Sequence, residues 1–191
     1  MLERNELHNY WKNPTPENQP DKYSSKGLNR RKRSRWLANT MEKYVPLDAK
    51  ILELGCNVGR NLWYLQKKGY SNLTGIDISA DAVHQSETFF PELDAELRVQ
   101  PLEQGWEGKY DVIYTMAVLV HIHPESEFIF ELMDANYIIT VEDENTSKER
   151  HCARNYHHIF RELGYYQVME EPVVPGLNQS YIARVLRKDE K

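Results

Sequence analysis

The stretch ILELGCNVGRN, residues 51–61, contains a short apolar run, a turn with two glycines and the start of a helical pattern. Three residues lie between Gly55 and Gly59, which gives the pattern G-x-x-x-G with Asn57 at the middle position. Asp77 follows Gly59 by 18 positions, at the end of the next apolar run, LTGIDI. A carboxylate at that place can accept hydrogen bonds from both ribose hydroxyls of an adenine nucleoside. Together the glycine turn and Asp77 predict a site for an adenosine-type ligand.

Two absent motifs and one carboxylate indicate which adenosine ligand is meant. A dinucleotide site needs G-x-G-x-x-G, whose middle glycine admits the pyrophosphate, and the spacing here differs. No Lys-Ser or Lys-Thr follows the turn, so a P-loop is excluded as well. Glu53, two residues before the first glycine, would repel a phosphate and attract an ammonium group. An adenosine ligand with an ammonium group and no phosphate is S-adenosylmethionine (SAM).

The rest of the chain alternates between patterns of strand and helix. Strands are expected at 51–54, 73–78, 97–100, 110–115 and 137–141, and helices at 28–45, 60–68, 80–89, 124–133 and 148–163. A closing pair at 166–170 and 181–186 predicts an antiparallel hairpin. Strands separated by helices predict an α/β fold, doubly wound, with a mainly parallel sheet and helices on both faces.

Composition limits the class of protein. A length of 191 residues predicts one domain over 1–191, with an N-terminal arm or lid at 1–28 and a core at 29–188. The 24 basic and 29 acidic residues give a net charge of −5, which argues against nucleic acid as a partner. Only two cysteines occur, and no apolar run approaches the ~20 residues of a membrane span, so we expect a cytoplasmic protein without a membrane partner.

The segment before the first strand has two open interpretations. Residues 1–28 are polar and proline-marked, which fits a loose tail, but the adjacent Tyr10 and Trp11 favour an arm laid over the ligand. In the basic helix that follows, Arg33 shares a face with the apolar Leu37. We therefore expect Arg33 to bind the SAM carboxylate and Trp11 to close over the same end. The alternatives for the basic run are a solvated helix face and a contact with phosphate or nucleic acid.

Residues 51–61 and 73–79 resemble the first two motifs of class I SAM-dependent methyltransferases of the small-molecule type. The resemblance extends over residues 28–188 and implies a Rossmann-like, seven-stranded sheet. It also implies that the glycine turn lines the methionine moiety, that Asp77 holds the ribose and that Ile78 packs on adenine, with Leu102 or Gln100 at the adenine edge. With the residues argued above, the predicted cofactor-binding set is Trp11, Arg33, Glu53, Gly55, Asn57, Gly59, Asn61, Asp77, Ile78, Leu102 and Met116.

The stretch TMAVLVHIHP, residues 115–124, follows the fourth strand. It resembles the segment of small-molecule methyltransferases in which a V-L-x-H sequence packs beside the transferred methyl group. His121 and His123 are the predicted catalytic bases, because histidine removes protons near neutral pH. His121 is preferred, since the family places a histidine there. Packing roles remain the alternative for both. Many relatives have glutamate where Val120 stands, and this departure removes an acid.

An acidic group, EDE at residues 142–144, ends the fifth strand. Glu142 and Asp143 are the predicted acceptor-binding residues. The alternatives are a solvated acidic turn and a divalent metal shared with a histidine such as His151, but no spacing is diagnostic of metal, so no metal site is predicted.

These observations predict a SAM-dependent methyltransferase that modifies a hydroxyl, amine or carboxylate of a small molecule. Two rivals stay open: a methyltransferase directed at RNA or protein, and a SAM-binding module without catalysis. The sequence predicts no oligomeric state.

Overall fold

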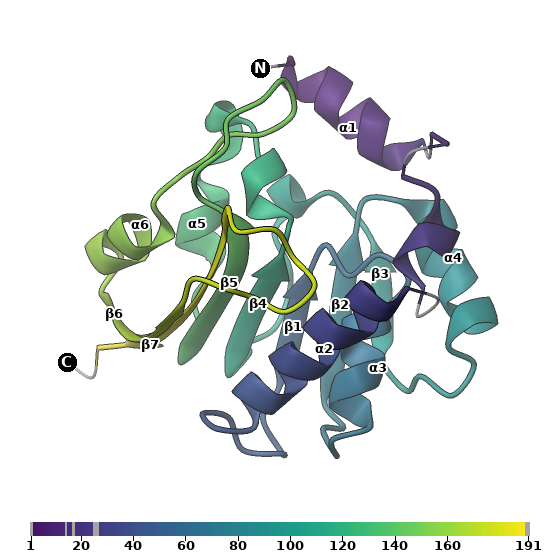
Figure 1. The fold of residues 1–191 in the computed structure, drawn as a ribbon, viewed down its shortest axis with the longest axis horizontal. Helices are drawn as coiled ribbons and strands as arrows, with labels where there is room; N and C mark the ends of the chain where they lie inside the picture. Colours follow the sequence, from purple (N-terminus) through teal and green to yellow (C-terminus); the bar gives the residue numbers. More distant parts are fainter. Residues whose placement is uncertain (1, 14, 17, 25–26, 190–191) are drawn as a thin grey trace.

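One seven-stranded sheet forms the centre of the structure, a computed structural model that describes residues 2–13, 15–16, 18–24 and 27–189. The strands are β1 (Ile51–Leu54), β2 (Leu73–Asp77), β3 (Glu96–Val99), β4 (Val112–Met116), β5 (Tyr137–Asp143), β6 (Tyr165–Glu171) and β7 (Tyr181–Lys188). They lie in the order β3-β2-β1-β4-β5-β7-β6 (Figure 1). β1 to β5 are parallel, whereas β7 is antiparallel to both β5 and β6. The predicted mainly parallel sheet with a C-terminal antiparallel hairpin is confirmed.

Helices cover both faces of this sheet, as the doubly wound prediction requires. α2 (Leu28–Met41) and α3 (Arg60–Gln66) pack on one face, and α5 (Ile129–Leu132) and α6 (Tyr156–Glu162) pack on the other. Successive strand residues point to opposite faces. Ile51 of β1 therefore belongs to the apolar cluster of Leu37 in α2, whereas Leu52 belongs to that of Phe160 in α6. Because β1 is buried on both faces, its apolar residues do not alternate with exposed polar ones, and its one polar residue, Glu53, is buried as well.

Two further parts of the fold are α4 and the N-terminal segment. α4 (Ala80–Phe89) contacts β2 and β3, and Ser79 caps it by accepting a hydrogen bond from the amide of Ala82. α1 (Arg4–Lys12) lies at the top of Figure 1, followed by the 3₁₀ turn η1 (Pro20–Tyr23). The side chain of Leu7 in α1 is only 2% exposed, so this helix packs against the body of the protein.

Four predicted helices have different bounds in the structure, and the one expected at 60–68 differs only in ending at Gln66. The helix expected at 148–163 begins only at Tyr156, so the prediction for 148–155 was wrong. Before Asn155 the backbone makes other hydrogen bonds: Lys148 and His151 form an isolated antiparallel bridge, and the amide of Cys152 donates to the carbonyl of Val120. The helix expected at 28–45 ends at Met41. The one expected at 124–133 consists of the 3₁₀ turn η4 (Pro124–Ser126) and α5; two further 3₁₀ turns are η2 (Leu102–Gln104) and η3 (Leu119–His121).

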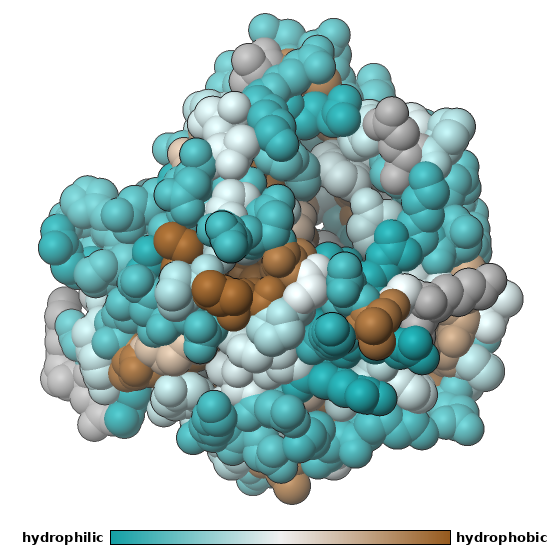
Figure 2. Space-filling model, viewed as in Figure 1, coloured by the Kyte–Doolittle hydropathy of each residue, from teal (hydrophilic) through white to brown (hydrophobic). Residues whose placement is uncertain are grey.

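The surface seen in Figure 2 is mainly hydrophilic, with hydrophobic residues gathered near its middle, over the segment between β6 and β7. Val173 in that segment is 63% exposed. Within the described ranges, the helices are all too short or too polar to cross a membrane.

Candidate active site

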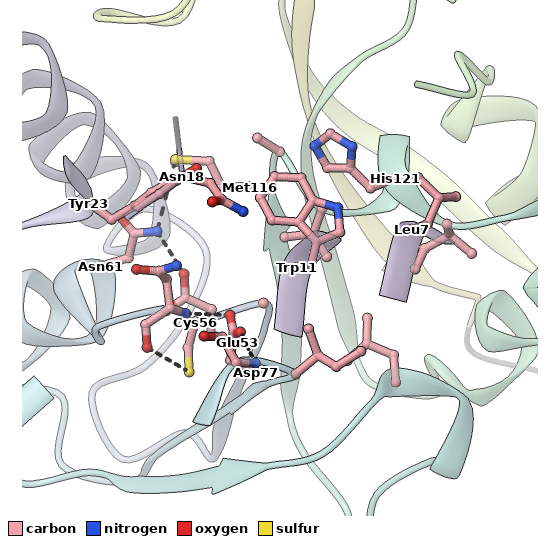
Figure 3. Close-up of a pocket in the computed structure, with 18 of the residues that line it drawn as sticks. Leu7, Trp11, Asn18, Tyr23, Glu53, Cys56, Asn61, Asp77, Met116 and His121 are labelled. Atoms are coloured by element: carbon pink, nitrogen blue, oxygen red, sulfur yellow. Dashed lines mark hydrogen bonds between the residues drawn. The ribbon is translucent and has the colours of Figure 1, made fainter. Parts of the chain in front are cut away.

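A cavity of about 330 Å³ lies beyond the carboxyl ends of β1, β2 and β4 (Figure 3). β1 pairs with β2 on one side and with β4 on the other, so the strand order reverses at this point. Ligands of open α/β sheets bind at such a switch point. The lining residues come from the strand ends, from α1 and from the start of α2 and α3, as expected for a pocket closed by the N-terminal segment.

The glycine turn after β1 has a left-handed backbone at three positions. Gly55 and Gly59 have φ of 73°, and Asn57 has φ of 50°. Asparagine tolerates this region better than other non-glycine residues, which explains how it replaces the middle glycine. Gly55 also has no room for a side chain, because a Cβ there would lie 2.3 Å from Cγ2 of Val118. The glycine turn is therefore in close contact with Val118, in the segment that follows β4.

Asp77 stands at the end of β2 and supports this turn. Its Oδ2 accepts a hydrogen bond from the amide of Asn57 at 2.7 Å, and its Oδ1 accepts one from the amide of Ser79 at 2.8 Å. Burial raises the pKa of Asp77 above its usual value, while these amides oppose the rise. Each carboxylate oxygen has a second lone pair. Asp77 can thus accept hydrogen bonds from a ligand in the cavity while it holds the turn.

Glu53 faces the same cavity from β1 and is 1% exposed. Its Oε1 accepts a hydrogen bond from Nδ2 of Asn61 at 2.7 Å, and the amide oxygen of Asn61 accepts one from the hydroxyl of Ser34. Arg60 joins this network through Nε, which donates to Ser34 Oγ at 2.8 Å, and through Nη1, which donates to the carbonyl of Tyr23. Burial raises the pKa of Glu53 to about 8. A buried carboxyl with this pKa favours a cationic partner.

Two buried N–H groups of the cavity lining provide a test of whether SAM fits. Nε of Arg33 and Nε1 of Trp11 are buried and make no hydrogen bond within the described part of the chain. Buried donors are normally satisfied, so donors that line a cavity indicate a ligand with acceptor atoms. An adenosine ligand with a carboxylate and an ammonium group supplies partners both for Arg33 and for Glu53. The lining therefore fits SAM.

The wall opposite the glycine turn is the segment after β4, and Glu142 holds it. Ala117 has φ of 59°, so the chain turns sharply there. The carboxylate of Glu142 accepts hydrogen bonds from the amide of Val118 at 3.0 and 3.1 Å and from that of Val120 at 3.2 Å. Glu142 is fully buried, and burial raises its pKa to about 7. Its structural role is to fix the wall that bears His121.

The two candidate histidines both line the cavity, and backbone groups decide their tautomers. Nδ1 of His121 lies 2.8 Å from the carbonyl of Arg150, which can only accept, so Nδ1 carries the proton of the neutral ring. Nδ1 of His123 accepts a hydrogen bond from the amide of Glu125 at 3.2 Å, so in the neutral ring the proton is on Nε2. Burial lowers the pKa of His121 to about 4. At neutral pH His121 therefore offers an acceptor nitrogen, and neutral His123 offers a donor.

The structure brings together most of the residues that the sequence singled out. Those predicted residues that line the cavity are Trp11, Arg33, Glu53, Gly55, Asn57, Asn61, Asp77, Ile78, Leu102, Met116, His121 and His123. Gly59 does not line it; it is the N-cap of α3, and a Cβ there would lie 2.6 Å from Leu93. Glu142 and Asp143 do not line it either. Asp143 instead accepts hydrogen bonds from the amides of Asn145 and Thr146, so both acids serve the backbone rather than an acceptor.

Several lining residues were not predicted from the sequence. They come from the N-terminal segment, from β7 and from near η2: Arg4, Leu7, His8, Asn18, Tyr23, Glu103 and Tyr181. His8 contacts Glu103 at 2.8 Å, a pair 95 residues apart in the chain. Helical spacing of Leu7 and Trp11 was the one available signal, because residues four apart share a helix face. Among the described residues, no three metal-binding side chains gather into one group.

Comparison with known proteins decides the family. A family model described as a methyltransferase domain matches residues 26–170. The chain belongs to this methyltransferase family. In fold it is similar to the magnesium protoporphyrin IX methyltransferase of Synechocystis, solved with S-adenosylhomocysteine: the TM-score is 0.68 at 16% identity, over 97% of this chain and 93% of that one. Its fold is thus that of the class I SAM-dependent methyltransferases, and the predicted Rossmann-like family and SAM cofactor are confirmed.

Curated relatives match over shorter stretches of this methyltransferase. A tRNA U34 carboxymethyltransferase of Shewanella amazonensis is 29% identical over 109 residues, which are 53% of this chain and 33% of the relative. The human EEF1A lysine methyltransferase 2 is 45% identical over 51 residues, 26% of this chain and 22% of the relative. The chain thus spans a third or less of the length of these relatives, whose names include both an RNA and a protein acceptor.

Proposed function

We propose that this protein transfers the methyl group of SAM to a small-molecule acceptor. The observation that carries the proposal is the roof of the cavity: Leu7, His8 and Trp11 of α1 cover the space beside His121 and Met116. A cavity of about 330 Å³ that α1 lines on this side suits a small ligand. A polymer would need an open approach to the methyl group, which α1 obstructs.

The residues of the cavity divide into groups with distinct tasks toward SAM. Asp77 accepts hydrogen bonds from the ribose, while the apolar Ile78 and Leu102 pack against adenine. Glu53 binds the ammonium group and Arg33 the carboxylate, since Glu53 and Nε of Arg33 are buried in the lining and each side chain takes the charge opposite to that of its partner in the complex. SAM supplies a methyl group on a cationic sulfur, which is displaced in line. Because such a displacement depends mainly on geometry, the protein contributes chiefly by positioning and by excluding water.

The two histidines give the acceptor side of the cavity its polarity. Nε2 of His121 accepts a hydrogen bond from the hydroxyl or amine of the acceptor and orients its lone pair. Nε2–H of neutral His123 donates to a second polar atom of the acceptor. The low pKa of His121, about 4, keeps its ring neutral over the physiological range. As the carbon of the methyl group bonds to the acceptor and its bond to sulfur breaks, the acceptor proton passes to Nε2 of His121, whose low pKa lets the ring release that proton to water.

The proposal is tested by measuring S-adenosylhomocysteine formation with three acceptor classes: a panel of small hydroxyl, amine and carboxylate compounds, total tRNA, and lysine-containing protein. We expect turnover with members of the first class only. A matched control is His121→Gln, which keeps a polar side chain of similar size and should lower turnover without weakening SAM binding. Turnover with tRNA or protein alone would contradict the proposal, and SAM binding without turnover on any acceptor would favour a non-catalytic module.

A second candidate is a methyltransferase acting on RNA, which one observation favours. Arg31, Lys32 and Arg35 of α2 are exposed and form a basic surface. If this surface binds RNA phosphates, the triple change of these residues to alanine weakens tRNA binding and flattens its salt dependence. Under the small-molecule proposal, the wild-type protein does not bind tRNA at low salt.

A further inference from the structure

His121 is enclosed by two segments that lie far from it in the sequence. The ring of Trp11 in α1 lies beside that of His121 (Figure 3), and the two ring centroids are 4.5 Å apart. On another side, the ring of His151 lies 4.8 Å away at 75°, and the carbonyl of Arg150 accepts the hydrogen bond from Nδ1. The environment of His121 therefore depends both on α1 and on the segment 148–151.

These two segments are also joined directly to each other. The guanidinium of Arg150 lies over the ring of Tyr10, with its carbon 4.3 Å from the ring centroid. The amide of Leu2, just before α1, donates to the carbonyl of Glu149 at 2.9 Å. Tyr10 in turn packs edge-on against Trp11, with centroids 5.0 Å apart. A closed circuit of contacts thus runs from the Arg150 side chain through Tyr10 and Trp11 to His121, whose Nδ1 donates to the carbonyl of Arg150.

We propose that Tyr10 and Arg150 are positioning residues: their contact docks α1 on the segment 148–151, which holds the Arg150 carbonyl on Nδ1 of His121 and presents Nε2 to the methyl acceptor. Neither residue lines the cavity, so neither touches cofactor or acceptor. The inference rests on the proposed function in one respect only, namely that His121 orients a methyl acceptor. The circuit of contacts stands without it.

The physical consequence of undocking α1 is specific to His121. Burial is the main reason for its low pKa, and the neighbouring His151 and Arg150 lower it further, whereas the hydrogen bond to the Arg150 carbonyl opposes them. If α1 leaves, Trp11 no longer covers the ring and water reaches it. The pKa of His121 then rises toward the ordinary ~6.5, and the ring samples both neutral tautomers. Replacing a residue that has only a structural role elsewhere would not change the pKa or the tautomer of His121.

The test is a nitrogen-15 NMR titration of histidine-labelled protein, with the His121 signals assigned by their loss in His121→Gln. Tyr10→Ala and Arg150→Ala remove the two sides of the contact, and Arg150→Ala keeps the backbone carbonyl. Tyr10→Phe retains the ring and is the matched control. Lys12→Ala changes an exposed residue of the same helix and controls for helix stability. Circular dichroism and thermal unfolding show that each variant is folded.

We expect His121 in the wild-type protein, Tyr10→Phe and Lys12→Ala to titrate well below pH 6 with Nδ1 protonated. In Tyr10→Ala and Arg150→Ala its pKa should rise by about one unit or more, with both tautomers populated. With an accepted substrate, kcat should fall about ten-fold or more in these two variants.

An unchanged pKa and tautomer of His121 in either alanine variant overturns the proposal, because both sides of the contact are required. If either alanine variant does not fold, Tyr10→Leu and Arg150→Gln are titrated in its place and read in the same way. If no acceptor is ever methylated, the proposed function fails, but the NMR result still decides whether α1 controls His121.

Discussion

The amide of Asn57 donates a hydrogen bond to Oδ2 of Asp77 at 2.7 Å, joining the glycine turn after β1 to the end of β2. The two residues are 20 positions apart, and each constrains the other. Asn57 holds a left-handed conformation, and Asp77 pins its amide in that conformation. The residue expected to bind the ribose is therefore also a structural support of the turn.

Replacing Asp77 with alanine should weaken SAM binding and also lower stability. Two charge-assisted hydrogen bonds to the ribose, each contributing roughly 1.5–3 kcal/mol, predict at least a ten-fold rise in Kd. The amides of Asn57 and Ser79 lose their acceptors in the same variant. Asp77→Asn keeps one acceptor oxygen and should retain more of the stability. Calorimetric titration with SAM and thermal unfolding separate the two effects; unaltered affinity in Asp77→Ala would count against Asp77 as a cofactor ligand.

The left-handed backbone at Asn57 predicts that replacement by alanine and replacement by glycine have different effects on stability. Asn57→Ala should destabilise the protein by about 1 kcal/mol or more, because alanine disfavours φ near 50°. For a domain of this size that lowers Tm by about 2–4 °C. Asn57→Gly should be close to wild type, since glycine adopts this conformation freely. Thermal unfolding of the pair is the measurement, and equal Tm values for the two variants would contradict the assignment.

Arg33 and Arg31 form a matched pair on α2. Arg33 lines the cavity with an unpartnered Nε, whereas Arg31 is exposed to solvent. If Arg33 binds the SAM carboxylate, Arg33→Ala should raise the Kd about ten-fold or more, by loss of a charge-assisted contact of roughly 1.5–3 kcal/mol. Arg31→Ala should leave the Kd within about two-fold. Titration calorimetry of both variants is the test, and similar Kd values would return Arg33 to a purely structural role.

The raised pKa of Glu53 predicts that SAM binding releases a proton below pH 8. In the free protein burial raises this pKa to about 8, so the carboxyl is mostly protonated at pH 6.5. An ammonium group stabilises the carboxylate and lowers its pKa, so binding expels the proton and the affinity weakens as the pH falls. Calorimetry at pH 6.5 in two buffers of different ionisation enthalpy measures that proton. Glu53→Gln should release none from this site; proton release equal to wild type in that variant would refute the role of Glu53.

Removing α1 should impair turnover more than folding. Leu7 and Trp11 cover the cavity, but the sheet and the helices on its two faces form their own apolar clusters without them. A protein lacking residues 1–13 should therefore unfold cooperatively while its turnover falls about ten-fold or more, because water reaches the methyl group. Activity and unfolding of the truncated protein are measured together, and full activity would show that α1 is not a lid.

The sequence alone was sufficient for the elements whose signals are local. The apolar run of β1, the cap at Ser79 and the hairpin of β6 and β7 follow from short patterns of apolar, capping and turn residues, and the structure has them within one or two residues of the expected bounds. The glycine turn and Asp77 were equally predictable from the sequence, because their spacing reflects one strand–helix–strand unit. Those signals also located the cavity, since the carboxyl ends of parallel strands meet at one edge.

Only the tertiary structure shows which polar groups distant in the sequence form hydrogen bonds with each other. Glu142 was expected to bind an acceptor, but β5 lies beside β4, and its carboxylate reaches the amides of Val118 and Val120 instead. The tautomer of His121 depends on the carbonyl of Arg150, 29 residues away. No local pattern encodes such contacts, because a buried polar group takes whichever partner the packed chain brings within hydrogen-bond distance. The spacing of residues located the cavity, and the packing of α1 and of the segment 148–151 determined the surroundings and the tautomer of His121.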